Sequence, residues 1–361
     1  MAKDKILLYG ANGYTGRLIA DYADGYKLPL ILAGRNAAAL REMAAKHQLT
    51  SVVCSLDDRA QLEKILQDVC LVIHAAGPFA HTARQMVEAC LATGTHYMDI
   101  NGDLTVFEFI KSYHAAAVQA NIMLIPGAGF DVVPTDCTAL YLQQQLTDAN
   151  QLELAFITQG GGISHGTATT MASKLGEGGA ERRKGVIVKR PLGEKHIWLT
   201  VSGKKRLAVS IPWGDVATAH TTTGIPDITT YTGVTPGMRR MLKWQKLFNG
   251  LLRSGWMRRL IQHRIDSSPP GPTADQRARA RTYVWGRVRN AAGQEASADL
   301  FCADGYTFTA HSCLLLAQKI ASGNWKPGYQ TPAGCYGAGL VWEVPGTVTA
   351  MADWQIMNTA V

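Results

Sequence analysis

The chain has 361 residues, enough for two domains, and an ordinary globular composition with 47% hydrophobic and 18% charged residues. No run reaches the ~18 uninterrupted apolar residues of a membrane-spanning helix, and the first five residues, Met-Ala-Lys-Asp-Lys, lead into a strand without a signal-peptide core. The net charge is +8, and the residues between Met238 and Ile265 contain eight cations and no acid. We therefore expect a cytoplasmic protein with one local basic patch and no nucleic-acid partner.

Several chemical signatures are missing from the sequence. The seven cysteines are scattered and form no Cys-x-x-Cys pair, so we expect reduced thiols, no disulfide framework and no metal site. There is no Ser-His-Asp order and no His-Glu-x-x-His pattern. Hydrolase and metalloenzyme functions therefore have no support in the sequence.

Short aliphatic runs alternate with helix-like stretches through the first 147 residues. Strands are predicted near 5–9, 29–33, 51–55, 69–75, 96–100 and 122–126. Helices are predicted near 15–23, 37–47, 58–67, 81–93, 105–120 and 135–147. This alternation predicts an α/β fold, a Rossmann-type doubly wound parallel sheet wrapped by helices. The loops that follow its strands would collect at the carboxyl edge of the sheet, where ligands bind.

The first of these loops is rich in glycine. Gly10, Gly13 and Gly16 lie between the first predicted strand and the first predicted helix. Glycines at such a place let backbone N–H groups approach a pyrophosphate at the helix N-terminus. The spacing is Gly-x-x-Gly-x-x-Gly, which differs from the commoner dinucleotide motif, so a second feature is needed.

Arg35 is that second feature, because it follows the second predicted strand. An acidic residue here would bind the ribose 2′-hydroxyl of NAD, whereas an arginine suits the 2′-phosphate of NADP. The sequence therefore predicts NADP as the cofactor. The alternative is a glycine turn beside a solvated arginine.

Beyond about residue 150, the sequence changes to runs rich in Thr, Val and aromatic residues that are joined by Gly, Pro and polar turns. Strands are predicted at 154–158, 198–201, 206–211, 229–232, 282–286 and 306–309, with helices near 166–176, 238–265 and 310–322. This pattern favours a second, mixed α+β domain with a mostly antiparallel or mixed sheet.

The basic segment 238–265 predicts two amphipathic helices that are separated at Ser254-Gly255. The first has an apolar arc of Met241, Trp244, Leu247, Phe248, Leu251 and Leu252, and the second has one of Trp256, Leu260 and Ile261. Two interpretations stay open. The helices bind an anionic membrane surface or admit a lipid-like substrate, or else their apolar arcs pack on the protein or across a dimer.

Five motifs occur in order in the first part of the chain. They are Gly-Ala-Asn-Gly-Tyr-Thr-Gly at 10–16, Ala-Gly-Arg at 33–35, Ala-Ala-Gly-Pro-Phe at 75–79, Thr-His-Tyr-Met-Asp-Ile-Asn-Gly at 95–102 and Gly-Phe-Asp-Val-Val-Pro-Thr-Asp at 129–136. Together they resemble the saccharopine dehydrogenase-like oxidoreductases, and more closely the branch that includes trans-acting enoyl reductases. The stretch 328–337 resembles the Thr-Pro-Ala segment near the end of those proteins.

The resemblance implies an NADP-binding Rossmann domain over 1–135, a substrate and dimerisation domain over 136–309, and a return of about 310–361 to the first domain. It implies a homodimer as one assembly of this chain. By motif, the cofactor would be held at the pyrophosphate by Gly10, Asn12, Gly13, Tyr14, Thr15 and Gly16, at the 2′-phosphate by Arg35, and at the nicotinamide by Ala76, Gly77 and Pro78. This chain has Gly102-Asp103 where relatives commonly have Gly-Glu.

Hydride transfer also needs a group that gives a proton or orients the substrate. The candidates are Asp131, His165, His81 and Tyr97. Each has a structural alternative. Asp131 lies where a helix cap is common, Tyr97 shares a strand face with Asp99 and both could simply pack, and the two histidines could be surface or loop residues.

The sequence thus predicts an NADP-dependent oxidoreductase that transfers a hydride to or from an apolar or acyl-type substrate, such as an enoyl or keto compound. Two alternatives stay open. A non-enzymatic NADP sensor or scaffold would bind the nucleotide without turnover. An amino-acid reductase of the saccharopine type would need a polar pocket with arginines for carboxylates.

Overall fold

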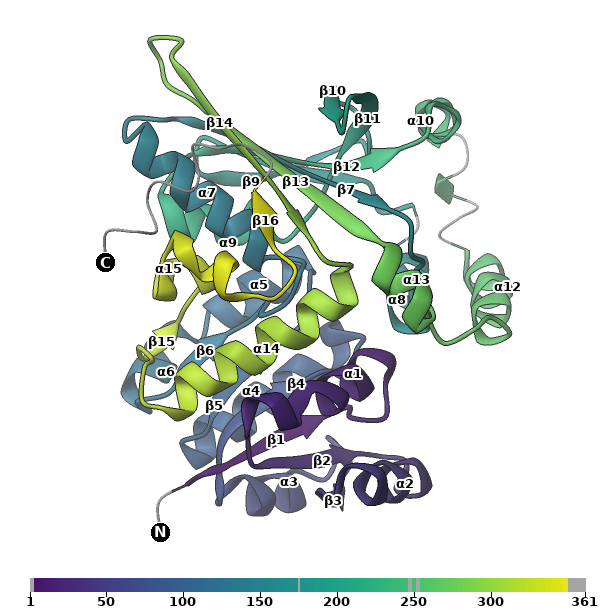
Figure 1. The fold of residues 1–361 in the computed structure, drawn as a ribbon, viewed down its shortest axis with the longest axis vertical. Coiled ribbons are helices and arrows are strands. Elements are labelled where there is room, and N and C mark those ends of the chain that lie inside the picture. The colour runs from purple at the N-terminus through teal and green to yellow at the C-terminus, as the bar shows by residue number, and fades with distance from the viewer. Residues whose placement is uncertain (1–2, 175, 246–248, 251–253, 350–361) are drawn as a thin grey trace. The chain divides into compact units, whose positions relative to one another are not determined.

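The computed structural model describes residues 3–349 except 175, 246–248 and 251–253. The chain divides into two compact units, which are described separately here (Figure 1). The first unit takes the residues up to Val133 together with 305–336 and 343–345, and the second takes 134–304, 337–342 and the residues from 346 onward. The chain therefore passes into the second unit and returns to the first at Gly305.

The first unit is built on a seven-stranded sheet with the order β15-β6-β5-β4-β1-β2-β3. Every pairing is parallel. Its strands are β1 (Lys5–Tyr9), β2 (Leu30–Gly34), β3 (Thr50–Val53), β4 (Val69–His74), β5 (His96–Asp99), β6 (Met123–Ile125) and β15 (Gly328–Tyr329). The strand order reverses between β1 and β4, which is the point where a doubly wound sheet binds its ligand. The predicted Rossmann-type fold is confirmed.

Helices cover both faces of this sheet. They are α1 (Tyr14–Tyr22), α2 (Ala37–His47), α3 (Arg59–Leu66), α4 (Phe79–Thr93), α5 (Leu104–Lys111), α6 (His114–Gln119), α14 (Gly305–Ala321) and α15 (Pro332–Tyr336), with a short 3-10 turn at Ala23–Tyr26. The single helix predicted over 105–120 is two helices. Ser112 Oγ donates to the Phe109 carbonyl oxygen at 2.6 Å, and such a local bond competes with the helical ones.

Alternation along the strands decides which face of the sheet each side chain covers. Leu7, Val72, Tyr97 and Leu124 belong to one core cluster, which includes buried residues of α3, α4 and α5. The neighbouring strand residues, such as Ile6 and Ile73, are fully buried on the opposite face. On that side α14 contacts both α1 and β4. A sheet buried on both faces explains why its strands read as continuous aliphatic runs.

The strand predicted over 306–309 is wrong, because these residues form the first turn of α14. Thr, Tyr and Phe favour strands locally. The longer pattern places Phe308, Leu316 and Ile320 at helical spacing, and all three are buried. Burial of that helical stripe overrides the local strand preference.

The second unit contains a nine-stranded mixed sheet. Its strands are β7 (Gln151–Gln159), β8 (Gly179–Arg183), β9 (Val186–Arg190), β10 (His196–Val201), β11 (Lys204–Ile211), β12 (Asp227–Val234), β13 (Arg281–Arg289), β14 (Glu295–Cys302) and β16 (Val348–Thr349). Among the described strands of this second sheet, only β7 and β12 pair in parallel. The predicted mixed sheet is confirmed, but the sequence pattern missed β8, β9, β14 and β16, which are short or rich in charge.

The helices of this part of the chain are α7 (Val133–Gln145), α8 (His165–Ser173), α9 (Asp215–Thr223), α10 (Pro236–Lys243), α12 (Gly255–Asp266) and α13 (Ala274–Arg279). The second basic helix begins at Gly255, as predicted. The first ends its regular run at Lys243, and the predicted arc residues Leu247, Phe248, Leu251 and Leu252 lie outside the described residues. Within the described part of the chain, every helix is too short or too polar to cross a bilayer.

Candidate functional site

The loop that follows β1 lies directly against the loop that follows β4. Gly10 has a φ of +86°, and a Cβ there would lie 2.8 Å from the Ala75 carbonyl carbon and 2.8 Å from Ala76 N. The Ala75 N–H donates to the Tyr9 carbonyl oxygen at 2.8 Å, which holds the two strand ends together. Only glycine combines this backbone conformation with this approach.

Gly16 packs α1 onto the same loop. A Cβ at Gly16 would lie 2.3 Å from the Gly10 carbonyl oxygen. The residue before the helix, Gly13, has no side chain to cap it, and the first turn of α1 contains no acidic residue. A helix N-terminus of this kind attracts an anionic group such as a pyrophosphate.

The other motif residues of this loop lie around the same helix start. Asn12 is half-buried, and its Oδ1 is 3.0 Å from the position that a Cβ of Gly34 would take. The Tyr14 ring packs edge-on against Tyr306 with the ring centroids 5.0 Å apart. Thr15 is half-buried in the first turn of α1. The glycine loop thus touches both the end of β2 and the start of α14.

Arg35 lies just after β2, in the loop that enters α2. Its side chain is exposed and has no ion-pair partner among the described residues. The next residue, Asn36, caps α2 by accepting a bond from the Ala39 N–H at 3.1 Å. An exposed guanidinium at this corner of the sheet suits the 2′-phosphate of NADP.

The loop after β4 contains Ala76, Gly77 and Pro78, and the Gly77–Pro78 peptide is cis. The Thr82 hydroxyl donates to the Ala76 carbonyl oxygen at 2.8 Å and lies 3.0 Å from Nε2 of His74. Burial lowers the pKa of His74 to about 3, so this ring is neutral. Sequence reasoning missed His74, whose only signal was a histidine that ends a buried strand.

Tyr97 and Asp99 lie on one face of β5, as alternation predicts. Both are fully buried, and the Tyr97 hydroxyl donates to Asp99 Oδ2 at 2.7 Å. Asp99 Oδ1 accepts bonds from the Asn101 N–H at 3.0 Å and the Gly127 N–H at 2.9 Å. Burial raises the pKa of both groups. Asp99 thus stabilises the loops that follow β5 and β6, and the Tyr97 hydroxyl is buried in the interior of the unit.

Asp131 lies on the loop that follows β6, and its carboxylate rests on Gly102, in the loop that follows β5. A Cβ at Gly102 would lie 2.4 Å from Asp131 Oδ2. Protein atoms surround the carboxyl group, although part of the residue reaches the surface. This burial raises the pKa of Asp131 to about 7. A carboxyl group with that pKa can both hold and release a proton at neutral pH.

Two side chains of α14 hold the Asp131 loop in place. The Phe130 N–H donates to Thr309 Oγ1 at 3.0 Å, and the Ser312 hydroxyl donates to the Ala128 carbonyl oxygen at 2.8 Å. A Cβ at Gly129 would lie 2.7 Å from Thr309 Cγ2. The strand prediction for 306–309 hid this role of Thr309. The helical spacing of Phe308, Leu316 and Ile320 could have revealed it.

The remaining predicted residues lie elsewhere. His81 is exposed in the first turn of α4, and Asp103 caps α5 by accepting a bond from the Thr105 N–H at 2.9 Å. In the second unit, His165 Nε2 lies 2.9 Å from Asp266 Oδ1. The side chains of Thr135 and Asp136 bond to α9, through Asp215 and Thr222 respectively. Of the four proton-donor candidates, only Asp131 combines a place at the strand ends with a pKa near neutrality.

Residues 6–125 match the saccharopine dehydrogenase NADP binding domain. This part of the chain is therefore an NADP-binding domain similar to that of the saccharopine dehydrogenases. Among curated relatives, a rat saccharopine dehydrogenase-like oxidoreductase is 24% identical over 204 residues, which are 50% of this chain and 48% of the relative. A putative trans-acting enoyl reductase of Mycobacterium tuberculosis is 31% identical over 188 residues, which are 47% of this chain and 44% of the relative.

A solved structure of the apo L-Glu-forming saccharopine dehydrogenase from Saccharomyces cerevisiae has the same fold. The TM-score is 0.67 with 12% sequence identity, over 94% of this chain and 96% of the other. The chain spans about half the length of the curated relatives it matches. Its glycine loop, Arg35 and the 75–78 loop all lie in the matched NADP-binding domain.

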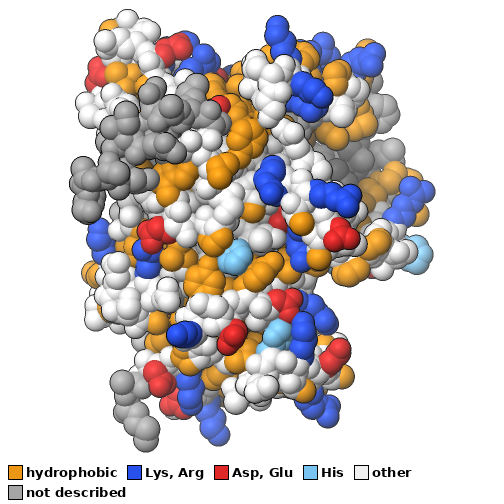
Figure 2. All heavy atoms as spheres, viewed as in Figure 1, with side chains coloured by type: hydrophobic (Ala, Val, Ile, Leu, Met, Phe, Trp, Pro, Cys, Tyr) orange, Lys and Arg blue, Asp and Glu red, His pale blue; other side chains and the backbone are white. Residues whose placement is uncertain are grey.

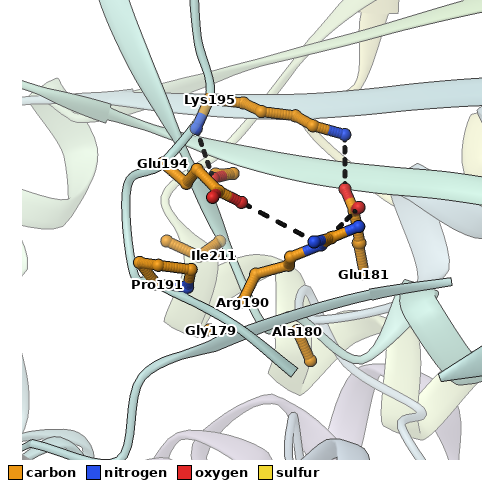
Figure 3. Close-up of a pocket in the computed structure, with 9 residues that line it drawn as sticks. Gly179, Ala180, Glu181, Arg190, Pro191, Glu194, Lys195 and Ile211 are labelled. Atoms are coloured by element: carbon orange, nitrogen blue, oxygen red, sulfur yellow. Dashed lines mark hydrogen bonds and ion pairs between the residues drawn. The ribbon is translucent and has the colours of Figure 1, made fainter. Parts of the chain in front are cut away.

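The second unit contains a polar pocket of a different kind, which Figure 3 shows. Glu181 on β8 is 2% exposed and forms ion pairs with Arg183 and Arg190 at 2.9 Å and a further one with Lys195. Burial alone would raise the pKa of Glu181, but the three cations outweigh it and lower the pKa to about 2. The cations of this cluster are thus occupied by a carboxylate of the chain itself.

Proposed function

We propose that the chain is an NADPH-dependent oxidoreductase that reduces an apolar, acyl-type substrate. One observation carries the proposal. Three features follow the carboxyl ends of strands in one parallel sheet. They are the glycine loop 10–16 after β1, which we call the cradle, the exposed Arg35 after β2, and the carboxyl group of Asp131 after β6, whose pKa is about 7. Ligands of such sheets bind at this edge.

The residues present fit a phosphorylated dinucleotide. A side chain at Gly10 or Gly16 would collide with neighbouring backbone atoms of the cradle. The N-terminus of α1 would hold the pyrophosphate. Arg35 would hold the 2′-phosphate. Ala76, Gly77 and Pro78 would line the nicotinamide side. When bound, NADPH supplies the hydride, and the chain supplies binding, orientation and a proton.

Asp131 is the group we assign to the proton. Its pKa of about 7 keeps a substantial protonated fraction at neutral pH, so its carboxyl can donate a proton to a substrate atom that gains negative charge. The loop bonds to Thr309 and Ser312 fix where this carboxyl lies. Tyr97 is a poorer candidate because its hydroxyl is buried and bonded to Asp99.

The acyl-type substrate is supported by the likeness to the mycobacterial relative, which is described as a putative trans-acting enoyl reductase. An amino-acid reductase would need cations that are free to bind substrate carboxylates. In the pocket of Figure 3, Arg190 and Lys195 are instead paired with Glu181, which also binds Arg183 on the same strand. The cations of this cluster are therefore not free to bind substrate carboxylates.

The test is NADPH oxidation by the purified full chain, followed by absorbance, with a panel of 2-enoyl and 3-keto acyl thioesters and a second panel of 2-oxo acids mixed with amino acids. We expect turnover on the acyl panel. Turnover only on the second panel would reject the acyl substrate in favour of an amino-acid reductase.

Calorimetric titration with NADPH and NADH runs in parallel with the assay. NADPH binding without turnover on either panel would favour the sensor or scaffold function. No binding of either coenzyme would overturn the whole proposal. Gly25→Ala is the matched control for variants of the cradle, because a Cβ at Gly25 meets nothing within 4 Å.

A further inference from the structure

Two helices of the second unit carry exposed aromatic and aliphatic side chains next to cations. On α12, Trp256 is 54% exposed and Leu260, one turn later, is exposed as well. Exposed large apolar side chains that cluster on one helix mark an interaction surface more often than chance. Figure 2 shows hydrophobic and basic side chains next to each other over α12, at the right edge of the view.

The other side of α12 is already used by the protein. Gln262 Nε2 donates to Thr169 Oγ1 of α8 at 3.2 Å, and Asp266 Oδ1 lies 2.9 Å from His165 Nε2 of α8. Ile261 and Ile265 on this side are half-buried. Internal packing therefore accounts for one stripe of the helix, and Trp256 and Leu260 belong to another.

The helix α10 repeats the combination. Met241 and Trp244 are each 63% exposed at its C-terminal end. Leu242, between them, packs towards Gly193, since its Cδ1 is 3.0 Å from the place of a Gly193 Cβ. Arg239 also lies 3.2 Å from Nδ1 of His196, so one side of the helix contacts the unit while Met241 and Trp244 stay exposed.

Arg258 on α12 pairs with Glu177 at 3.6 Å, but other cations of these two helices are unpaired among the described residues. Arg240, Lys243, Arg259 and Arg264 have no ion-pair partner among the residues that the structure describes. The segment 238–265 has no acid, and its eight cations equal the net charge of the whole protein. A surface that combines exposed apolar side chains with unpaired cations suits a partner that has anionic groups at its surface and an apolar layer beneath them.

We propose that α10 and α12 form a docking surface for an anionic lipid membrane, with Met241, Trp244, Trp256 and Leu260 entering the interface and the neighbouring cations at the headgroups. A second copy of the chain fits less well, because the same surfaces meeting each other would bring unpaired cations together. The proposal does not depend on the substrate of the first unit.

The test is flotation of the full chain with two kinds of vesicle, phosphatidylcholine alone and phosphatidylcholine with phosphatidylserine. We expect the protein to float with the vesicles that contain phosphatidylserine and to be released by high salt. Arg240→Glu combined with Arg259→Glu should weaken binding by roughly fivefold for each cation removed. Trp244→Ser combined with Trp256→Ser should weaken it by about tenfold or more at any salt concentration.

Lys204→Glu combined with Lys205→Glu is the matched control, since it makes the same charge change at two exposed residues that begin β11. It should float like the unchanged protein, and all variants should still bind NADPH, which shows that they are folded. If the control lost as much vesicle binding, the effect would depend on net charge alone, and the proposed docking surface would be wrong.

Absence of flotation would overturn the proposal as well. A change of oligomeric state in the tryptophan variant without flotation of the parent would assign the surface to a dimer. Binding of a single-stranded RNA oligonucleotide without flotation would assign it to nucleic acid.

Discussion

The carboxyl edge of the first sheet and the Glu181 pocket of the second unit are both rich in functional groups, but they satisfy those groups differently. At the sheet edge, Arg35 has no ion-pair partner among the described residues, and burial leaves Asp131 with a pKa of about 7. In the pocket, Glu181 is paired with Arg183, Arg190 and Lys195, and its pKa is about 2.

The difference distinguishes a binding edge from a structural cluster. A group that binds a ligand or transfers a proton is left unpaired by the protein itself, and this lowers the stability of the fold. A buried carboxylate that three cations neutralise has no such capacity left, and its pairing stabilises the charged form. Predictions for four substitutions test this contrast, beginning with the largest expected effect.

Asp131→Asn should lower kcat by roughly 10² to 10⁴-fold, because the amide keeps the shape but cannot donate the proton. Wild-type activity should fall above pH about 7 as Asp131 ionises, and the residual activity of the variant should lose this dependence. The measurement is the pH profile of kcat with saturating NADPH. An unchanged kcat would remove Asp131 from the chemistry.

The same substitution should have the opposite effect on stability. The pKa of the folded state lies above the ordinary carboxyl value of 3.8, so the favourable contribution of Asp131 is present at low pH and is lost as the pH rises through about 7. Asp131→Asn should therefore raise the melting temperature above neutral pH. A variant that is both less active and less stable would indicate a structural role.

Gly16→Ala should lower the free energy of unfolding by about 2–3 kcal/mol and weaken NADPH binding, because its Cβ would collide with the Gly10 carbonyl oxygen. Denaturant unfolding and calorimetry measure the two effects. Gly25→Ala, where the added methyl group meets open space, should change stability by no more than about 0.5 kcal/mol. Similar results for both variants would contradict the close packing of the cradle.

Glu181→Gln should lower the free energy of unfolding at neutral pH by about 2 kcal/mol, since three partly exposed cations lose their shared partner. The pKa of Glu181 lies below its ordinary value of 4.5, so its stabilisation is present above that pH and is lost as the pH falls through about 2. The variant should lack this acid-dependent loss.

Glu194→Gln is the control for the cluster. Glu194 is 3.9 Å from Arg190 and its side chain is 44% exposed, so its loss should cost less than about 1 kcal/mol. Neither variant should alter NADPH affinity, because the cluster is a structural feature of the second unit. Reduced affinity for a carboxylate substrate in Glu181→Gln would instead restore the amino-acid reductase hypothesis.

Arg35→Ser should weaken NADPH binding by roughly tenfold and leave NADH binding nearly unchanged, because only NADPH has the 2′-phosphate. Arg41→Ser, a second exposed arginine on the neighbouring helix α2, serves as the control and should affect neither coenzyme. Calorimetric titrations with both coenzymes decide the outcome. Equal weakening for the two coenzymes would show that Arg35 does not recognise the phosphate.

The sequence by itself determined the doubly wound sheet, the glycine loop and the position of Arg35. These features depend on local patterns, such as aliphatic runs buried on both faces and glycines between a strand and a helix, and each pattern fits within a few tens of residues. The mixed sheet of the second unit was also visible from composition. Its strands β8, β9 and β14 were missed because charged residues such as Glu181 and Arg190 hide strands whose charges are paired across the fold.

Only the tertiary structure decided which candidate carboxyl or hydroxyl is chemically useful. Asp131 and Tyr97 were both candidates from the sequence. Burial beside Gly102 raises the pKa of Asp131 to about 7, whereas the Tyr97 hydroxyl is buried and bonded to Asp99. The helix at 305–321, which a local strand pattern concealed, anchors the Asp131 loop from about 180 residues away in the chain. The pKa and the placement of a side chain depend on neighbours that are distant in sequence, and local sequence patterns do not predict those contacts.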